Sequence, residues 1–70
     1  MTISLVKNNI LQEKNFEYGQ SSVDIVEFYA NGELMYDGKP EEVTELITGF
    51  INALEFLDLE FTIEENYEEP

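Results

Sequence analysis

The chain has 70 residues, enough for one small domain at most, and it contains no Cys and no His. Disulfides, metal sites built on thiolate or imidazole, and catalysis by Ser–His or Cys–His pairs are therefore excluded. Sixteen Asp and Glu against three Lys leave a net charge of −13, which opposes binding to nucleic acids and to anionic membranes.

The first 21 residues fit more than one structure. Apolar and polar residues alternate at the start, as in a short strand: Thr2, Ile3, Ser4 and Leu5. A turn at Asn8 and Asn9 would then lead into a second strand through Phe16 and Tyr18. A short helix is the alternative, because four apolar residues also fit a helical stripe: Leu5, Val6, Ile10 and Leu11.

Residues 23–38 predict a β-hairpin, because Asn31 and Gly32 suit a two-residue turn with positive φ at both positions. The expected register pairs Ala30 with Glu33, Phe28 with Met35 and Val26 with Asp37 on one face, and Tyr29 with Leu34 and Glu27 with Tyr36 on the other. Both faces are partly apolar. One helix can cover only one of them, so a partner, a second copy or the N-terminal segment should shield the other.

A helix should begin near Lys39, because Pro40 suits the first turn and acidic residues favour the positive end of the helix dipole. Its apolar stripe has helical spacing: Val43, Leu46, Ile47, Phe50, Leu54 and Leu57. Asp58 marks its end.

The last strand follows from strict alternation, in which Leu59, Phe61 and Ile63 point one way and Glu60, Thr62 and Glu64 the other. Residues 64–70 should form a flexible acidic tail of a single domain, 1–70. The expected fold class is α+β, an antiparallel three- to four-stranded sheet with one amphipathic helix packed on one face.

Catalysis is not expected, because the chain lacks nucleophile–base pairs and a Gly-rich phosphate loop, and a domain this small offers no substrate cleft. No calcium-loop motif organises the carboxylates, so neither a metal nor another cofactor is predicted. No apolar stretch approaches the roughly 20 residues of a membrane span, and no signal peptide is visible, so a cytoplasmic location is expected.

The acidic residues are the candidate binding groups. Residues 39–70 carry ten acids and one Lys, whereas residues 1–38 carry six acids and two Lys. Rows of carboxylates on a folded surface can occupy the place of phosphates in a nucleic-acid-binding protein: Asp37, Glu41, Glu42, Glu45, Glu55, Glu60, Glu64, Glu65, Glu68 and Glu69. Tyr29, Leu34 and Tyr36 are candidate apolar anchors. The simpler interpretation is a solvated helix face, a solvated tail and ordinary core residues.

Three stretches in order, YANGELMYD, KPEEVTELITGF and EENYEEP, resemble the acidic type II-A anti-CRISPR proteins that act as DNA mimics. The resemblance covers roughly residues 22–70 and lies in size, charge and element order. It implies that carboxylates occupy phosphate or PAM-contact positions in the basic DNA-reading cleft of a nuclease effector. The first 21 residues lack the acidic helix of those proteins, so a restriction enzyme, glycosylase, polymerase or repressor is an equal candidate partner.

The sequence therefore predicts a phage anti-defence inhibitor that binds a basic nucleic-acid-binding protein, in the host cytoplasm, without binding nucleic acid itself. The alternative is a homodimeric regulatory or interaction module, antitoxin-like or a structural phage protein, whose acidity serves solubility.

Overall fold

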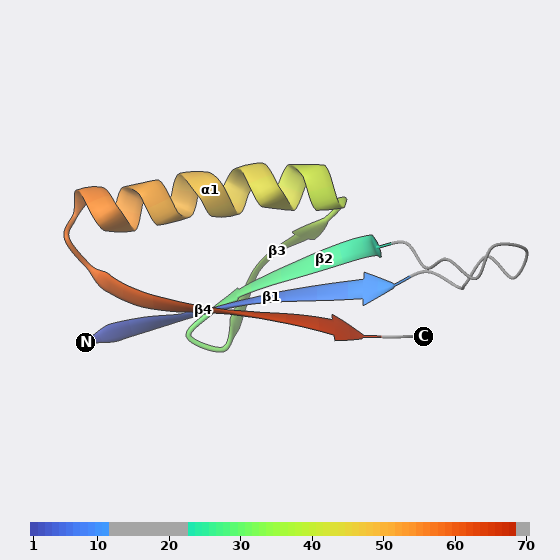
Figure 1. The fold of residues 1–70 in the computed structure, drawn as a ribbon, viewed down its shortest axis with the longest axis horizontal. Coiled ribbons are helices and arrows are strands. Elements are labelled where there is room, and N and C mark those ends of the chain that lie inside the picture. Colours follow the sequence, from blue (N-terminus) through green and yellow to red (C-terminus); the bar gives the residue numbers. More distant parts are fainter. Residues whose placement is uncertain (12–22, 69–70) are drawn as a thin grey trace, which may run out of the picture.

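A computed structural model describes residues 1–11 and 23–68. In these residues the elements follow in the order β1 (Thr2–Leu11), β2 (Val23–Ala30), β3 (Glu33–Gly38), α1 (Pro40–Phe56) and β4 (Glu60–Glu68). The helix lies along one side of a twisted four-stranded sheet (Figure 1). The predicted α+β class is confirmed.

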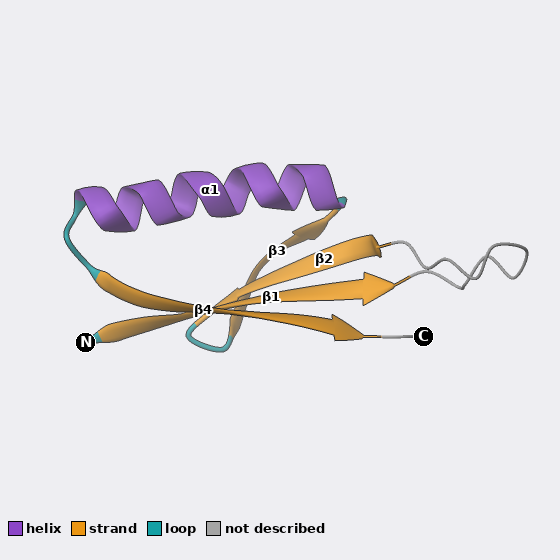
Figure 2. Cartoon of the chain, viewed as in Figure 1, coloured by secondary structure: helices purple, strands orange, loops and turns teal. Residues whose placement is uncertain are grey.

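The sheet is mixed, whereas a purely antiparallel sheet was predicted. The strand order is β3-β2-β1-β4, with antiparallel β3–β2 and β2–β1 pairs and a parallel β1–β4 pair. Helix α1 provides the reason, because it carries the chain back across the sheet from the β3 edge to the β4 edge (Figure 2). Strands β3 and β4, which this crossover joins, run in the same direction. Because β3 also runs parallel to β1, β4 pairs with β1 as a parallel strand.

Strand β1 is continuous, so the predicted turn at Asn8 and Asn9 and the alternative short helix are both wrong. Asn8 pairs with Glu27 and Asn9 with Val26, each within the ladder between β1 and β2. Both asparagines are held by cross-strand side-chain bonds, which a propensity argument does not see. The predicted second strand through Phe16 and Tyr18 lies outside the described residues.

The hairpin turn is confirmed, with φ of 50° at Asn31 and 81° at Gly32. Asn31 also ties the turn to β1: its amide donates to the Ser4 carbonyl at 2.7 Å, and its side-chain oxygen accepts from the Ser4 amide at 2.9 Å. The turn of the β2–β3 hairpin is thereby fixed to the neighbouring strand on the far side of β2.

A bulge in β3 changes the predicted register. The pairs Ala30–Glu33 and Tyr29–Leu34 are confirmed, but Phe28 lies opposite Tyr36, Glu27 opposite Asp37 and Val26 opposite Gly38. The expected pairs of Phe28 with Met35, Val26 with Asp37 and Glu27 with Tyr36 are therefore wrong. Met35 is the extra residue, and it moves Tyr36 onto the face that carries the helix.

Helix α1 begins and ends as predicted. Pro40 follows the cap residue Lys39, and the helix closes at Phe56. Asp58 has φ of 57°, and the Leu59 amide donates to the Leu54 carbonyl at 2.9 Å, which is the bond of a Schellman motif. Aspartate takes the left-handed position that glycine fills more easily.

The core lies between α1 and the middle of the sheet. Phe28 on β2 is fully buried and meets Phe50 of the helix edge to face, with ring centroids 5.4 Å apart. The buried apolar residues come from both layers: Leu5, Val26, Phe28, Val43, Ile47 and Leu54. This core is small and lies beneath the helix, so the two edge strands, β3 and β4, remain largely exposed.

Strand β4 continues to Glu68, so the predicted boundary of a flexible tail at Glu64 is corrected. Residues 64–68 pair with β1, from Val6 opposite Glu64 to Ile10 opposite Glu68. Glu69 and Pro70 lie outside the described residues. The acidic end of the chain is thus part of an edge strand, which gives its glutamates defined directions.

Candidate functional site

The side of the sheet that faces away from α1, the open face, contains two of the three predicted anchors, Tyr29 and Leu34, and part of the predicted carboxylates. Alternation along β1 assigns the two sides: buried Leu5 and Asn9 lie beneath the helix layer, and Val6, Asn8 and Ile10 face the other way. The cross-strand register extends this assignment to the other three strands.

An apolar band crosses the open face. Val6, Tyr29 and Leu34 are neighbours on three adjacent strands, and Ile10 lies opposite Ile25. Leu34 and Ile25 are 47% and 42% exposed, which is unusually high for large apolar side chains on a sheet with a helix on its other face. The band therefore offers apolar area that the helix does not cover.

Carboxylates from β2, β3 and β4 share the open face with this apolar band: Glu27, Asp37, Glu60, Glu64 and Glu68. No lysine occupies a described strand position on this side, because Lys7 points to the helix layer. The Glu27 carboxylate accepts hydrogen bonds from the side-chain nitrogen of Asn8 at 3.2 Å and from the Tyr29 hydroxyl at 3.1 Å. The open face is thus anionic, with neutral donors instead of cations between its carboxylates.

Three of these carboxylates raise the pKa of Tyr29. The hydrogen bond to Glu27 raises the pKa of the Tyr29 phenol, and partial desolvation and the negative charges of Glu27, Glu68 and Asp37 raise it further. Carboxylates from three strands therefore act on one ring, and the neutral, hydrogen-bonding form of that ring is favoured.

The helix carries a second, separate set of predicted carboxylates. Glu41, Glu45 and Glu55 are exposed on α1, on the opposite side of the molecule from the open face. Glu42 accepts a hydrogen bond from the Tyr36 hydroxyl at 3.2 Å, and its charge and this bond raise the pKa of Tyr36. Gly38 leaves room for this approach, because a Cβ there would lie 3.1 Å from Glu42 Oε2 and from the Tyr36 ring.

Two corrections to the predicted site follow. Its carboxylates do not form one surface, because the sheet lies between the open face and the helix, which carries Glu41, Glu42, Glu45 and Glu55. Tyr36 does not accompany Tyr29 and Leu34, because the bulge in β3 turns it toward Glu42.

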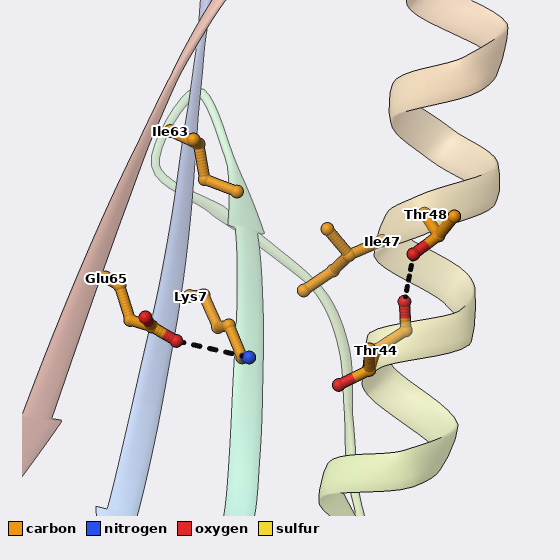
Figure 3. A pocket seen from close by; sticks show the side chains of 6 residues that line it. All are labelled: Lys7, Thr44, Ile47, Thr48, Ile63 and Glu65. Carbon is orange, nitrogen blue, oxygen red and sulfur yellow. Dashed lines mark hydrogen bonds and ion pairs between the residues drawn. The ribbon is translucent and has the colours of Figure 1, made fainter.

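A groove runs between α1 and β4, and it contains Glu65, the last of the predicted carboxylates that lie within the described residues. The groove holds about 230 Å³, and Ile47 and Ile63 point into it from its two sides (Figure 3). Lys7 Nζ lies 3.2 Å from Glu65 Oε2, and this ammonium lowers the pKa of Glu65, with smaller contributions from Asn9 and Tyr67. The negative charge of Glu65 is therefore paired with Lys7 on the helix side, and Glu65 is not part of the anionic open face.

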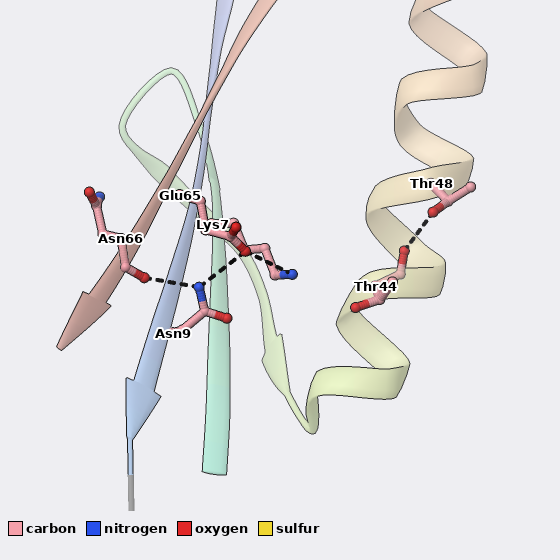
Figure 4. A network of polar contacts seen from close by, with 6 residues as sticks. All are labelled: Lys7, Asn9, Thr44, Thr48, Glu65 and Asn66. Carbon is pink, nitrogen blue, oxygen red and sulfur yellow. Dashed lines mark hydrogen bonds and ion pairs between the residues drawn. The ribbon is translucent and has the colours of Figure 1, made fainter. Parts of the chain in front are cut away.

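Asn9 fastens β4 to β1 beside this ion pair (Figure 4). Its side-chain nitrogen donates to the Asn66 carbonyl at 2.9 Å and to Glu65 Oε2 at 3.4 Å. Asn9 is 3% exposed, which makes this bond more valuable than one at the surface.

Sequence reasoning missed Lys7, Asn9 and Glu27 as parts of the site. Asn9 and Lys7 carried no readable signal, because their roles depend on the parallel pairing of β1 with β4. Tyr67 lies on the helix side of β4, where the alternation of Phe61 and Ile63, continued along the chain, would assign it.

Within the described residues, no group of three or more acidic side chains is arranged to hold a metal ion. The described residues contain one helix, α1, and it is not long and apolar enough to cross a bilayer. Comparison of the chain with protein-family models, curated proteins and solved structures finds no match in any of the three. The chemistry of the surfaces is therefore the basis for a functional interpretation.

Proposed function

We propose that the protein is an acidic inhibitor that binds the basic nucleic-acid-binding surface of a partner protein through its open face. The observation that carries this proposal is the combination, on one face, of an exposed apolar band with five carboxylates and no lysine at its described strand positions. The proposal contains no catalytic step and no direct contact with nucleic acid.

The charge pattern supports a partner of this class. Proteins that bind nucleic acids present Lys and Arg to neutralise phosphates, and Arg pairs with carboxylates in the same bidentate geometry that it uses for phosphates. Such a surface would meet Asp37, Glu64 and Glu68 at the borders of the open face. Electrostatic attraction speeds the encounter and weakens with salt.

The apolar band supports a specific complex. Tyr29 and Leu34 lie side by side across β2 and β3, and a tyrosine ring contributes contact area at a small entropic cost. A surface that served solubility alone would need the carboxylates but not this apolar band, in which Leu34 and Ile25 are exposed. The order of elements resembles acidic anti-CRISPR proteins, so a nuclease effector in a bacterial cytoplasm is the first partner to test.

The test begins with capture of the partner from bacterial lysate at low salt and its release at high salt. The captured protein is then given labelled DNA, and increasing amounts of the inhibitor should displace that DNA. A partner that holds DNA and this protein at the same time, with neither affecting the other, contradicts the proposal.

Two matched charge reversals locate the binding surface. Asp37→Lys with Glu64→Lys alters the open face, and Glu41→Lys with Glu45→Lys changes the net charge equally on the helix. The open-face variant should bind about tenfold more weakly or worse, because interfacial charge pairs are strongly coupled, and the helix variant should stay within about threefold. Equal weakening would mean that net charge, and not this face, drives binding.

The homodimeric module is the other candidate, and the observation that favours it is the pair of half-buried Tyr29 and exposed Leu34 on the open face. Sedimentation at micromolar concentration separates the two functions. A dimer that hides Tyr29 and Leu34 favours the module, whereas a monomer favours the inhibitor. Two open faces would bring like charges together, so we expect a monomer.

A further inference from the structure

Strand β4 forms an edge of the sheet with the properties of a strand acceptor. It lies at the end of the strand order, and its ladder with β1 runs over nine residues with no register shift. No other described strand lies on its outer side. The backbone amides and carbonyls of such an edge can pair with an added strand.

The side chains of β4 form two rows of different chemistry. The open-face row contains Glu60, Glu64 and Glu68, separated by Thr62 and Asn66. The helix-side row is apolar apart from Glu65, whose charge is matched by Lys7. In this second row Ile63 is 49% and Tyr67 is 62% exposed. One row therefore selects cations and the other selects apolar side chains.

The groove beside Ile63 can receive an apolar side chain. Its volume of about 230 Å³ is several times the roughly 30 Å³ that one water occupies in the liquid, so a branched aliphatic side chain fits. Ile47 and Ile63 supply its apolar walls, and Thr44 and Thr48 lie on the helix side (Figure 3). The Thr48 hydroxyl is already satisfied, since it donates to the Thr44 carbonyl at 2.9 Å.

We propose that the outer edge of β4 binds an extended segment of a partner protein in which basic and apolar residues alternate. The segment pairs with β4 as a further strand. Successive side chains of a strand point to opposite faces, so its basic residues meet Glu60, Glu64 and Glu68 while its apolar residues meet Ile63 and Tyr67.

The charges on β4 exclude other occupants. Antiparallel pairing of two β4 strands would bring the glutamate rows of both copies together, and like charges directly opposite are destabilising. An acidic segment or a nucleic acid would be repelled by the same glutamates. The inference goes beyond the proposed function, since it requires no nucleic-acid-binding activity in the partner, although Glu64 and Glu68 belong to both surfaces.

The test uses two synthetic peptides as long as β4 and no partner protein. One alternates lysine and valine, and the other has the same composition with all lysines before all valines. The alternating peptide should bind about tenfold more tightly, because only it can satisfy both rows while pairing with the backbone. It should also slow hydrogen exchange of β4 amides and leave β3 unaffected. N-methylation of every peptide bond should abolish this protection.

Two matched variants test the groove. Ile63→Asp should weaken binding of the alternating peptide about tenfold, because the apolar side chain of the peptide loses its site. Ile25→Asp, which has similar exposure but lies on the open face of β2, should change it by less than about twofold. Circular dichroism checks that both variants fold.

Three results would overturn the inference: equal binding of the two peptides, protection of β3 instead of β4, or no binding at low salt. The N-methylated peptide preserves the test if Ile63→Asp fails to fold. Since no nucleic acid enters this experiment, its failure leaves the proposed inhibition intact, and failure of DNA displacement leaves the peptide result intact.

Discussion

The two edges of the sheet are protected in different ways. Strand β3 is six residues long, bulged at Met35, and held to the helix by the bond between Tyr36 and Glu42. Strand β4 is nine residues long, continuous in register, and protected mainly by its glutamates. Irregular geometry hinders every strand that could add to an edge, whereas charge hinders only strands of the same sign. The difference makes β4, and not β3, the selective edge.

The largest effect on stability should come from a substitution at Phe28, which is fully buried between the sheet and the helix. Phe28→Ala removes the contact with Phe50 and should lower the free energy of unfolding by about 3–5 kcal/mol, measured by urea denaturation. Ile25→Ala, on the same strand but exposed on the open face, should cost less than about 1 kcal/mol. Equal costs would mean that the helix does not anchor the sheet through Phe28.

Asn9 tests how firmly β4 is held. Asn9→Ala removes the donor to the Asn66 carbonyl and should cost about 1–3 kcal/mol, with faster hydrogen exchange at the end of β4. Asn8→Ala is the control, because Asn8 bonds to Glu27 on the open face, and it should cost less than about 1 kcal/mol. A larger loss from Asn8 than from Asn9 would contradict the assigned roles.

Deletion of Met35 would remove the protection of β3. It should give a regular hairpin in which Tyr36 still lies opposite Phe28, so the free energy of unfolding should change by less than about 1 kcal/mol. The straightened edge should increase self-association at high salt, measured by sedimentation. Met35→Ala, which keeps the bulge, should not. An unfolded deletion variant would show that the bulge is required for the fold.

The smallest effects are pH-dependent and have opposite signs at the two edges. Lys7 lowers the pKa of Glu65. The contribution of this ion pair to the free energy of unfolding is therefore fully present above the unfolded pKa of about 4.5, and it is lost as the pH falls through the lowered folded pKa. Glu42 raises the pKa of Tyr36, so that contribution is present below about 10.0 and is lost as the pH rises through the raised value.

Protonation of Glu65 should lower the free energy of unfolding by about 0.5 kcal/mol or less, because Glu65 is half-exposed and solvent screens its ion pair with Lys7. An NMR titration of the Glu65 carboxyl should show the lowered pKa in the native protein and a value closer to 4.5 in Lys7→Met. An unchanged pKa in the variant would remove Lys7 as the cause.

Local patterns were sufficient to predict the hairpin turn, the helix and the last strand. Asn31 and Gly32 require positive φ, and Pro40 and Asp58 mark helix ends through rules that act over a few residues. The parallel pairing of β4 with β1 was not predictable in this way, because it depends on where the helix returns the chain. The continuity of β1 through Asn8 and Asn9 likewise depends on partners distant in sequence.

The candidate site was predicted in its chemistry but not in its arrangement. Tyr29 and Leu34 share a face as expected, because their pairing lies close to the turn. The bulge at Met35 has no clear sequence signal, and one extra residue was enough to move Tyr36 to the other side. Glu65 was counted with its acidic neighbours, and its pairing with Lys7 required knowledge of the β1–β4 register.

The pairing of β1 with β4 also sets the order in which the protein can fold. Thr2 lies opposite Glu60, 58 positions later, whereas the hairpin and the helix form from near neighbours. During synthesis β1 emerges first, and its partner emerges after every other described element. Contacts between such distant segments form slowly, because the loop that joins them must close first. Until then a central strand has one unpaired side, so the newly made chain is most vulnerable to aggregation along β1.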